Sequence, residues 1–178
     1  MNAYLQSLAE VTQFTDHADA LDIKRVETDI PLREFAVGFL GYQPAWITFL
    51  YRVRQAIVPL LGLKHEGMPH ATTLSPNELP MQAGEHFGFF KVASAEEDHH
   101  WFASADDDHL TAYLGIVQEP LSGNHHRFYI VTAVHYRNWA GPGYYNLIRP
   151  FHHLVVYSMI RAALRGANHK QEPVQAKA

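Results

Sequence analysis

Apolar residues recur along this chain with two different spacings. A period of two, rich in β-branched and aromatic residues, is typical of strands, and a period near 3.6 is typical of helices. Strands are expected at 22–30, 87–94, 99–104, 108–118 and 127–137, and helices at 32–40, 44–58 and 150–165. The predicted order is therefore one strand, two helices, several antiparallel strands and a long last helix, which is an α+β fold.

The last predicted helix is the most apolar one. We expect it to begin at Pro150, because a first-turn residue needs no N–H donor, and to end at Gly166. Its polar side chains form a single stripe at i, i+4 and i+8, namely His153, Tyr157 and Arg161. Because most of its other positions are apolar, the helix should be covered on most sides by a curved antiparallel sheet that wraps around it.

The two ends and one internal segment lack this periodicity. We expect residues 1–20 to form an arm or short helix, 21–166 a single domain and 167–178 a disordered tail. Prolines and glycines between 64 and 84 predict a long connection, or a loop that covers something. The segment 138–143 is expected to be a loop that leads into the last helix.

Composition narrows the class of protein. A net charge of −4, with no face rich in lysine or arginine, argues against nucleic-acid binding. The absence of cysteine excludes disulfides, thiolate catalysis and cysteine zinc sites from this sequence. No signal peptide is expected, and the most apolar run, 45–63, is interrupted by arginines and a proline, so no membrane span is expected either. The cytoplasm is the expected compartment.

Strand parity predicts which side chains point into the core. In 108–116 and 128–136 the even positions form the more apolar face, so that face should be inward. On the last helix the apolar sector is centred near Met159 and includes His152. The polar side chains expected to point inward are Asp108, Thr132, Tyr136 and His152. Polar groups that converge in an apolar cavity are typical of a small-molecule site.

These polar groups suggest acid–base chemistry as one option. His152 with Asp108 would form a general base and its orienting carboxylate, and Tyr136 would donate a proton. The commoner alternative is a buried histidine that a neighbouring carboxylate or hydroxyl satisfies. Neither a nucleophile elbow nor a glycine-rich phosphate loop occurs in the sequence, so no catalytic residue is assigned.

The 13 histidines invite a metal site, but their spacing is wrong for one within a single element. Ligand pairs need i, i+4 on a helix or i, i+2 on a strand, whereas these histidines form adjacent doublets. We therefore expect no metal and no cofactor. A site assembled from distant residues, for example Asp106, Asp108 and His99, stays open as an alternative.

Two stretches resemble an uncharacterised bacterial family. They are the segment from Glu97 through Trp101 to Asp107-Asp108-His109-Leu110, and the segment 144–152. That family is a domain of unknown function, also found appended to NAD-dependent epimerase-like domains. The resemblance covers roughly 25–166, although Thr111 and Ala112 stand where the family pattern has a second acid and an aromatic residue.

The element order is similar to that of the START-like helix-grip fold, the SRPBCC superfamily of lipid-transfer domains and polyketide cyclases. The resemblance implies a fold more than an activity. Our preferred hypothesis is a protein that binds a small hydrophobic or amphipathic molecule in a cavity between the sheet and the last helix. The expected walls are Leu110, Leu114, Ile130, Val134, Val155 and Met159, with Trp46 as a further aromatic side chain.

The expected polar contacts are those of Asp108, Thr132, Tyr136 and His152. Two other classes of function stay open. One is a cyclase or dehydratase that uses the same His, Asp and Tyr side chains. The other is a structural or regulatory module that meets a protein partner, and the oligomeric state is open, with a homodimer as one option.

Overall fold

The computed structural model describes residues 2–60 and 75–170. Strands and helices follow one another much as the hydrophobic pattern predicts, and the fold is α+β. The elements in chain order are α1 (Ala3–Gln6), α2 (Ala9–Thr15), β1 (Ala20–Thr28), α3 (Leu32–Leu40), α4 (Ala45–Leu60), the 3₁₀ turn η1 (Pro76–Glu78), β2 (His86–Phe87), β3 (Phe90–Glu96), β4 (His100–Asp106), β5 (Leu110–Pro120), β6 (His126–Tyr136) and α5 (Ala140–Lys170).

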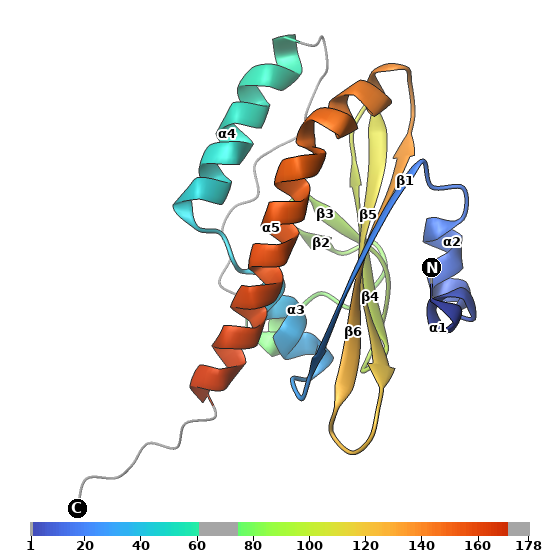
Figure 1. Ribbon diagram of the computed structural model, residues 1–178, viewed down its shortest axis with the longest axis vertical. Coiled ribbons are helices and arrows are strands. Elements are labelled where there is room, and N and C mark those ends of the chain that lie inside the picture. The colour runs from blue at the N-terminus through green and yellow to red at the C-terminus, as the bar shows by residue number, and fades with distance from the viewer. Residues whose placement is uncertain (1, 61–74, 171–178) are drawn as a thin grey trace, which may run out of the picture.

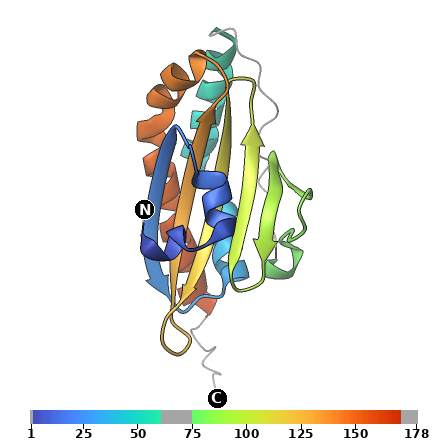
Figure 2. The same ribbon diagram turned by 90° about the vertical axis from the view of Figure 1, so that its right-hand side faces the viewer.

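The strands form one antiparallel sheet of six, in the order β1-β6-β5-β4-β3-β2, so the first strand pairs with the last. Asp22 and Leu114 both lie opposite Thr132 in the register. Directly opposite residues point to the same face of a sheet, so these three side chains share one face. Helix α5 runs along that face, and α1 and α2 lie on the other face (Figures 1 and 2).

The face toward α5 carries the largest core. Helix α3 packs between the sheet and the C-terminal part of α5, where a Cβ at Gly38 would lie 3.0 Å from Ala163 Cα. Phe35 of α3 stacks on Phe128 of β6, with ring centroids 4.5 Å apart. The even positions of β5 and β6 point to this core, as strand parity predicts.

The opposite face is buried as well, which parity did not predict. Leu5 and Val11 of the two short N-terminal helices are fully buried, and they pack on Val117 and Val131 of the sheet. The ring of Phe102 occupies the space above Gly115, where a Cβ would lie 2.1 Å from it. Residues 3–15 therefore form a third layer rather than a free arm.

Helix α5 is much longer than predicted. It begins at Ala140, whose N–H donates to the Asn138 side chain at 2.9 Å, so only the first two residues of the loop expected at 138–143 precede the helix, and the prediction is wrong for 140–143. Asn is a favourable helix cap, and Pro142 in the first turn lacks only an N–H that needs no helical partner. Pro150 and Gly166, the predicted ends, both lie inside the helix. A proline inside a helix bends it, and Figure 1 shows the first turns of α5 inclined to the rest.

The strand predicted at 87–94 is divided into β2 and β3 by a turn at Gly88 and Phe89, where Gly88 has a positive φ. The other predicted elements agree with the structure to within about two residues at each end. Of the segment 64–84, residues 64–74 lie outside the described residues, and η1 falls in the remainder. Of the expected tail 167–178, the first four residues belong to α5 and the others lie outside the described residues. Among the described helices, none has the length and apolar character that crossing a membrane requires.

Candidate functional site

A polar cluster lies where β1 faces the middle of α5. Asp22 and Lys24 are two residues apart on β1 and share the face toward the helix. Lys24 Nζ lies 2.5 Å from Asp22 Oδ2 and 3.2 Å from His153 Nδ1. His153 Nδ1 lies 3.4 Å from the same Asp22 oxygen. One carboxylate is thus shared by an ammonium and an imidazole.

His152 approaches this carboxylate from the helix. Its Nε2 is buried, lies 3.7 Å from Asp22 Oδ2, and has no hydrogen-bond partner in the described part of the chain. Burial lowers the pKa of His152 to about 4, although the negative charge of Asp22 acts in the opposite direction. The imidazole is therefore neutral near pH 7, so one ring nitrogen is available to accept a proton or a hydrogen bond.

Asp22 is held as a carboxylate at the centre of the cluster. Burial raises its pKa, but the hydrogen bond and charge of Lys24, and then the charges of the two histidines, outweigh burial and leave the pKa below its usual value. The neighbouring Thr132 Oγ1 is buried and likewise has no hydrogen-bond partner among the described residues. Unpaired buried polar atoms are uncommon, and a bound water or ligand can satisfy them.

A pocket of about 280 Å³ opens beside the cluster, between β1, the end of β6 and the first half of α5. This volume is near the lower end of the range of small-molecule sites, about 300–1,000 Å³. Its wall carries two carboxylates, two phenols and a guanidinium as well as short apolar side chains. The lining residues are Asp19, Ala20, Leu21, Asp22, Tyr136, Tyr145, Asn146, Arg149 and His153.

The two phenols of this pocket are proton donors at neutral pH. Burial, with the nearby charge of Asp19, raises the pKa of Tyr136. Burial, with the charge of Asp22, raises the pKa of Tyr145. The Asp19 carboxylate is already engaged, because its Oδ2 accepts the backbone N–H of Tyr136 at 2.6 Å. Arg149 is the pocket residue that carries a full positive charge.

Of the four predicted polar residues, two lie at this pocket, Thr132 lies beside the polar cluster opposite Asp22, and Asp108 lies elsewhere. Tyr136 lines the pocket and His152 adjoins it, but Asp108 is exposed and precedes β5, so its predicted inward orientation is wrong. The reason is a turn: residues 107–109 lie between the end of β4 and the start of β5 and pair with neither neighbouring strand, so strand parity does not apply to Asp108. The carboxylate beside His152 is Asp22.

The predicted apolar walls are divided among several packed regions. Leu110 and Val134 pack against two tyrosines of α5, and Leu114 and Ile130 belong to the main core. Trp46 is half-buried on α4.

The last two predicted wall residues, Val155 and Met159, line a separate apolar cavity of about 40 Å³ next to β2 and the start of α4. A cavity of this size has room for a few water molecules rather than for an apolar ligand.

The alternative metal set drawn from the sequence does not form. His99 precedes β4, whereas Asp106 is its last residue and Asp108 lies beyond it. A strand of this length separates its ends by about 20 Å, so one ion cannot contact all three side chains.

Parity applied to β1 would have identified Asp22 and Lys24, which lie two residues apart on one face of a predicted strand. Asp19 and Arg149 lie outside the predicted elements, so no periodicity could have identified them.

Comparisons with known proteins point to a family without an assigned activity. No significant match was found among curated proteins or among solved structures. Residues 10–159 match the family described as "Protein of unknown function (DUF2867)". This range runs from α2 through the sheet and into the second half of α5, so it contains the polar cluster and the pocket. Because the match extends over most of the chain, the protein belongs to this family of unknown function.

Proposed function

We propose that the protein binds a small amphipathic molecule in the pocket between β1, β6 and α5. The observation that carries this proposal is the pocket itself, about 280 Å³ in volume, beside a buried His152 Nε2 that has no hydrogen-bond partner among the described residues. We also propose that the fold is of the START-like helix-grip type. The element order and the long α5 along one face of the sheet support this assignment (Figure 1).

The chemistry of the wall defines the kind of ligand. Arg149 suits an anionic group such as a carboxylate, because a guanidinium can donate two parallel hydrogen bonds to it. Tyr136 and Tyr145 supply phenol groups and aromatic surface, and Ala20 and Leu21 supply short apolar contacts. A ligand with one anionic end and one apolar end fits this wall better than a purely apolar molecule.

Native mass spectrometry of the freshly purified protein tests the proposal. We expect an excess mass that disappears on denaturation, and we expect Arg149→Ala to lose it because the pocket then lacks its cation. Arg161→Ala is the matched control, since Arg161 is exposed about three turns further along α5 and outside the pocket. An excess mass retained by Arg149→Ala would place the ligand elsewhere, and its absence from the unaltered protein would contradict tight binding.

A second candidate function is acid–base catalysis on the bound molecule. The observation that favours it is the neutral His152 with its free Nε2 and the Asp22 carboxylate 3.7 Å away, which would stabilise the imidazolium after proton transfer. To test it, the molecule that native mass spectrometry detects as the excess mass would be incubated with the protein in D₂O. Catalysis would be supported if the unaltered protein exchanged an acidic C–H of this molecule for C–D, and if His152→Gln still bound the molecule but no longer catalysed the exchange. No exchange with the unaltered protein would contradict catalysis.

A further inference from the structure

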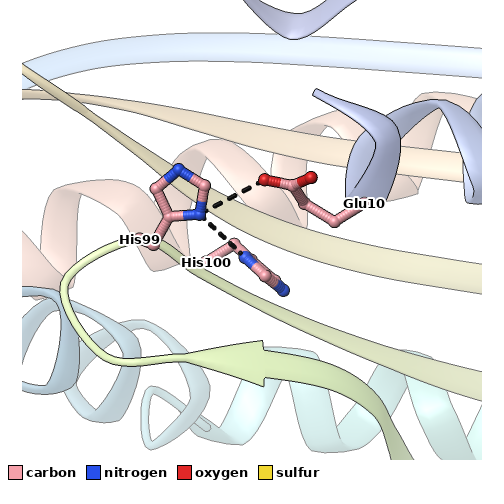
Figure 3. Close-up of side chains that lie close together, drawn as sticks. All are labelled: Glu10, His99 and His100. Atoms are coloured by element: carbon pink, nitrogen blue, oxygen red, sulfur yellow. Dashed lines mark hydrogen bonds and ion pairs between the residues drawn. The ribbon is translucent and has the colours of Figure 1, made fainter. Parts of the chain in front are cut away.

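Three metal-ligating side chains converge on the other side of the sheet, far from the pocket. They are Glu10 of α2, His99 of the β3–β4 turn and His100, the first residue of β4 (Figure 3). Their nearest donor atoms all lie within 4.8 Å of one another. None of the three takes part in the proposed ligand site. Two of them, His99 and His100, are adjacent in the sequence, a spacing that argued against a metal site within one element.

The hairpin turn explains how two adjacent histidines reach one point. Glu96 pairs with His100, so the loop between β3 and β4 has three residues, and Asp98 within it takes a left-handed conformation with φ of 55°. This tight turn removes His99 from the strand pleat, which would otherwise direct the two rings to opposite faces. Both imidazoles then approach the Glu10 carboxylate.

The separations fit a single small cation. His99 Nδ1 lies 3.3 Å from Glu10 Oε1 and 3.2 Å from His100 Nδ1. Tetrahedral ligands at about 2.0–2.1 Å from a zinc ion lie about 3.3 Å from each other. The donor atoms are therefore already spaced like two edges of a zinc coordination shell.

A supporting hydrogen bond orients the most buried ligand. His100 is only 3% exposed, and its Nε2 lies 2.8 Å from Ser94 Oγ. When Nε2–H donates to this hydroxyl, the lone pair of Nδ1 faces the other two donors, which is the arrangement found in metal-bound histidines.

We propose that Glu10, His99 and His100 bind one divalent transition-metal ion of the zinc class, which joins α2 to the β3–β4 hairpin. Two imidazoles and one carboxylate suit zinc, whereas calcium and magnesium prefer all-oxygen sites. Water, or the Glu96 carboxylate, which lies 3.8 Å from His99 Nδ1, would complete the tetrahedron. The ion would fasten the N-terminal layer to the sheet, because its ligands come from both.

Isothermal titration calorimetry of the full chain with Zn²⁺, after a chelator has removed any bound metal, measures the affinity and stoichiometry and so tests the proposal. We expect one ion per chain, with affinity reduced at least 10-fold in Glu10→Gln and in His99→Ala. Both side chains are partly exposed, at 24% and 31%, so these variants should fold, and circular dichroism in chelator checks that they do. His86→Ala, which removes an exposed histidine of β2, is the control and should bind as the unaltered protein does.

Two further readouts separate a metal site from a hydrogen-bonded cluster. Zn²⁺ should raise the melting temperature of the unaltered protein and leave that of Glu10→Gln unchanged. Co²⁺ in place of Zn²⁺ should produce the visible absorption bands of a tetrahedral ion. Less than one equivalent bound, or equal affinity in all variants, would show that the three side chains form only a hydrogen-bonded cluster.

Discussion

The two faces of the sheet are both covered by helices, but they bury different groups. On the N-terminal face, short helices bring Leu5, Val11 and Phe14 onto an apolar surface. On the face toward α5, an equally apolar core ends at a row of polar groups where β1 meets the helix. A strand face beneath a long helix can thus hold a polar site at one edge and a packed core elsewhere. The layer of two short helices covers its face with a few apolar side chains, of which Leu5 and Val11 are fully buried, and it too has a polar cluster at one end, formed by Glu10, His99 and His100.

The largest expected effects come from matched aromatic truncations on the two faces. Phe102 and Phe128 are both fully buried, Phe102 against the N-terminal helices and Phe128 against α3. Each change to Ala should cost about 3–5 kcal/mol of unfolding free energy, because it removes a buried ring and leaves a cavity. Urea denaturation measures both. A cost for Phe102→Ala below about 1 kcal/mol would mean that the N-terminal layer adds little stability.

Leu5→Ala tests the N-terminal layer directly. Leu5 belongs to a helix of four residues and is fully buried, so its truncation should cost about 2–5 kcal/mol. Gln6→Ala in the same helix removes an exposed side chain and should change stability by no more than about 0.5 kcal/mol. If both changes had equally small effects on the free energy of unfolding in a denaturant titration, the N-terminal helices would not be packed stably on the sheet.

Much of the fold was predictable because its strands and helices have strong periodicity. The helix at 32–40 and the hairpins of β4, β5 and β6 follow from local patterns alone. The N-terminal layer was not predictable in this way. The side chains that form it are Leu5, Val11 and Phe14, which pack on the face of the sheet formed by the odd positions of β5 and β6. Local periodicity does not show that this face is apolar enough to be covered, because that depends on how the strands pair in the tertiary structure.

The candidate site was predictable in part, for a similar reason. His152 and Tyr136 were found by facing directions within single elements. Asp108 was misplaced because parity was carried across a turn, and Asp22 was missed although it lies on a predicted strand. The early start of α5 was missed because Pro150 was interpreted as the first residue of the helix, whereas it lies inside α5, and the cap at the true start is the single side chain of Asn138.

The pH dependence of stability should distinguish the polar edge from the packed core. The pKa of His152 is lowered to about 4 in the folded protein, against about 6.5 in the unfolded chain. As the pH falls, His152 of the unfolded chain therefore takes up a proton before His152 of the folded protein does. The contribution of the neutral, buried His152 to the free energy of unfolding is complete above about pH 6.5 and is lost as the pH falls toward about 4. Between about pH 7 and pH 4.5 the loss should be on the order of 2 kcal/mol.

His152→Gln should flatten that part of the curve. The comparison with the unaltered protein is needed because burial also lowers the pKa of His100, so the protein loses a further contribution to stability from His100 as the pH falls. Asp22 acts at lower pH, because its carboxyl pKa lies below its usual value and its contribution is lost only under more acidic conditions. Identical curves for His152→Gln and the unaltered protein, measured by denaturation at each pH, would show that His152 does not titrate as a buried group.

The smallest effect concerns how the charges in the polar cluster interact. Lys24→Met keeps most of the side-chain length and removes the ammonium, which both repels the His152 imidazolium and neutralises Asp22. The pKa of His152 should rise, yet stay below its usual value because burial, its largest cause, is unchanged. The cost in stability should be about 1 kcal/mol or less. NMR titration of the histidine rings measures the shift, with the exposed Lys91→Met as the control. A pKa that stays the same would show that the Lys24 ammonium does not act on His152, and it would contradict the coupling of charges within the polar cluster.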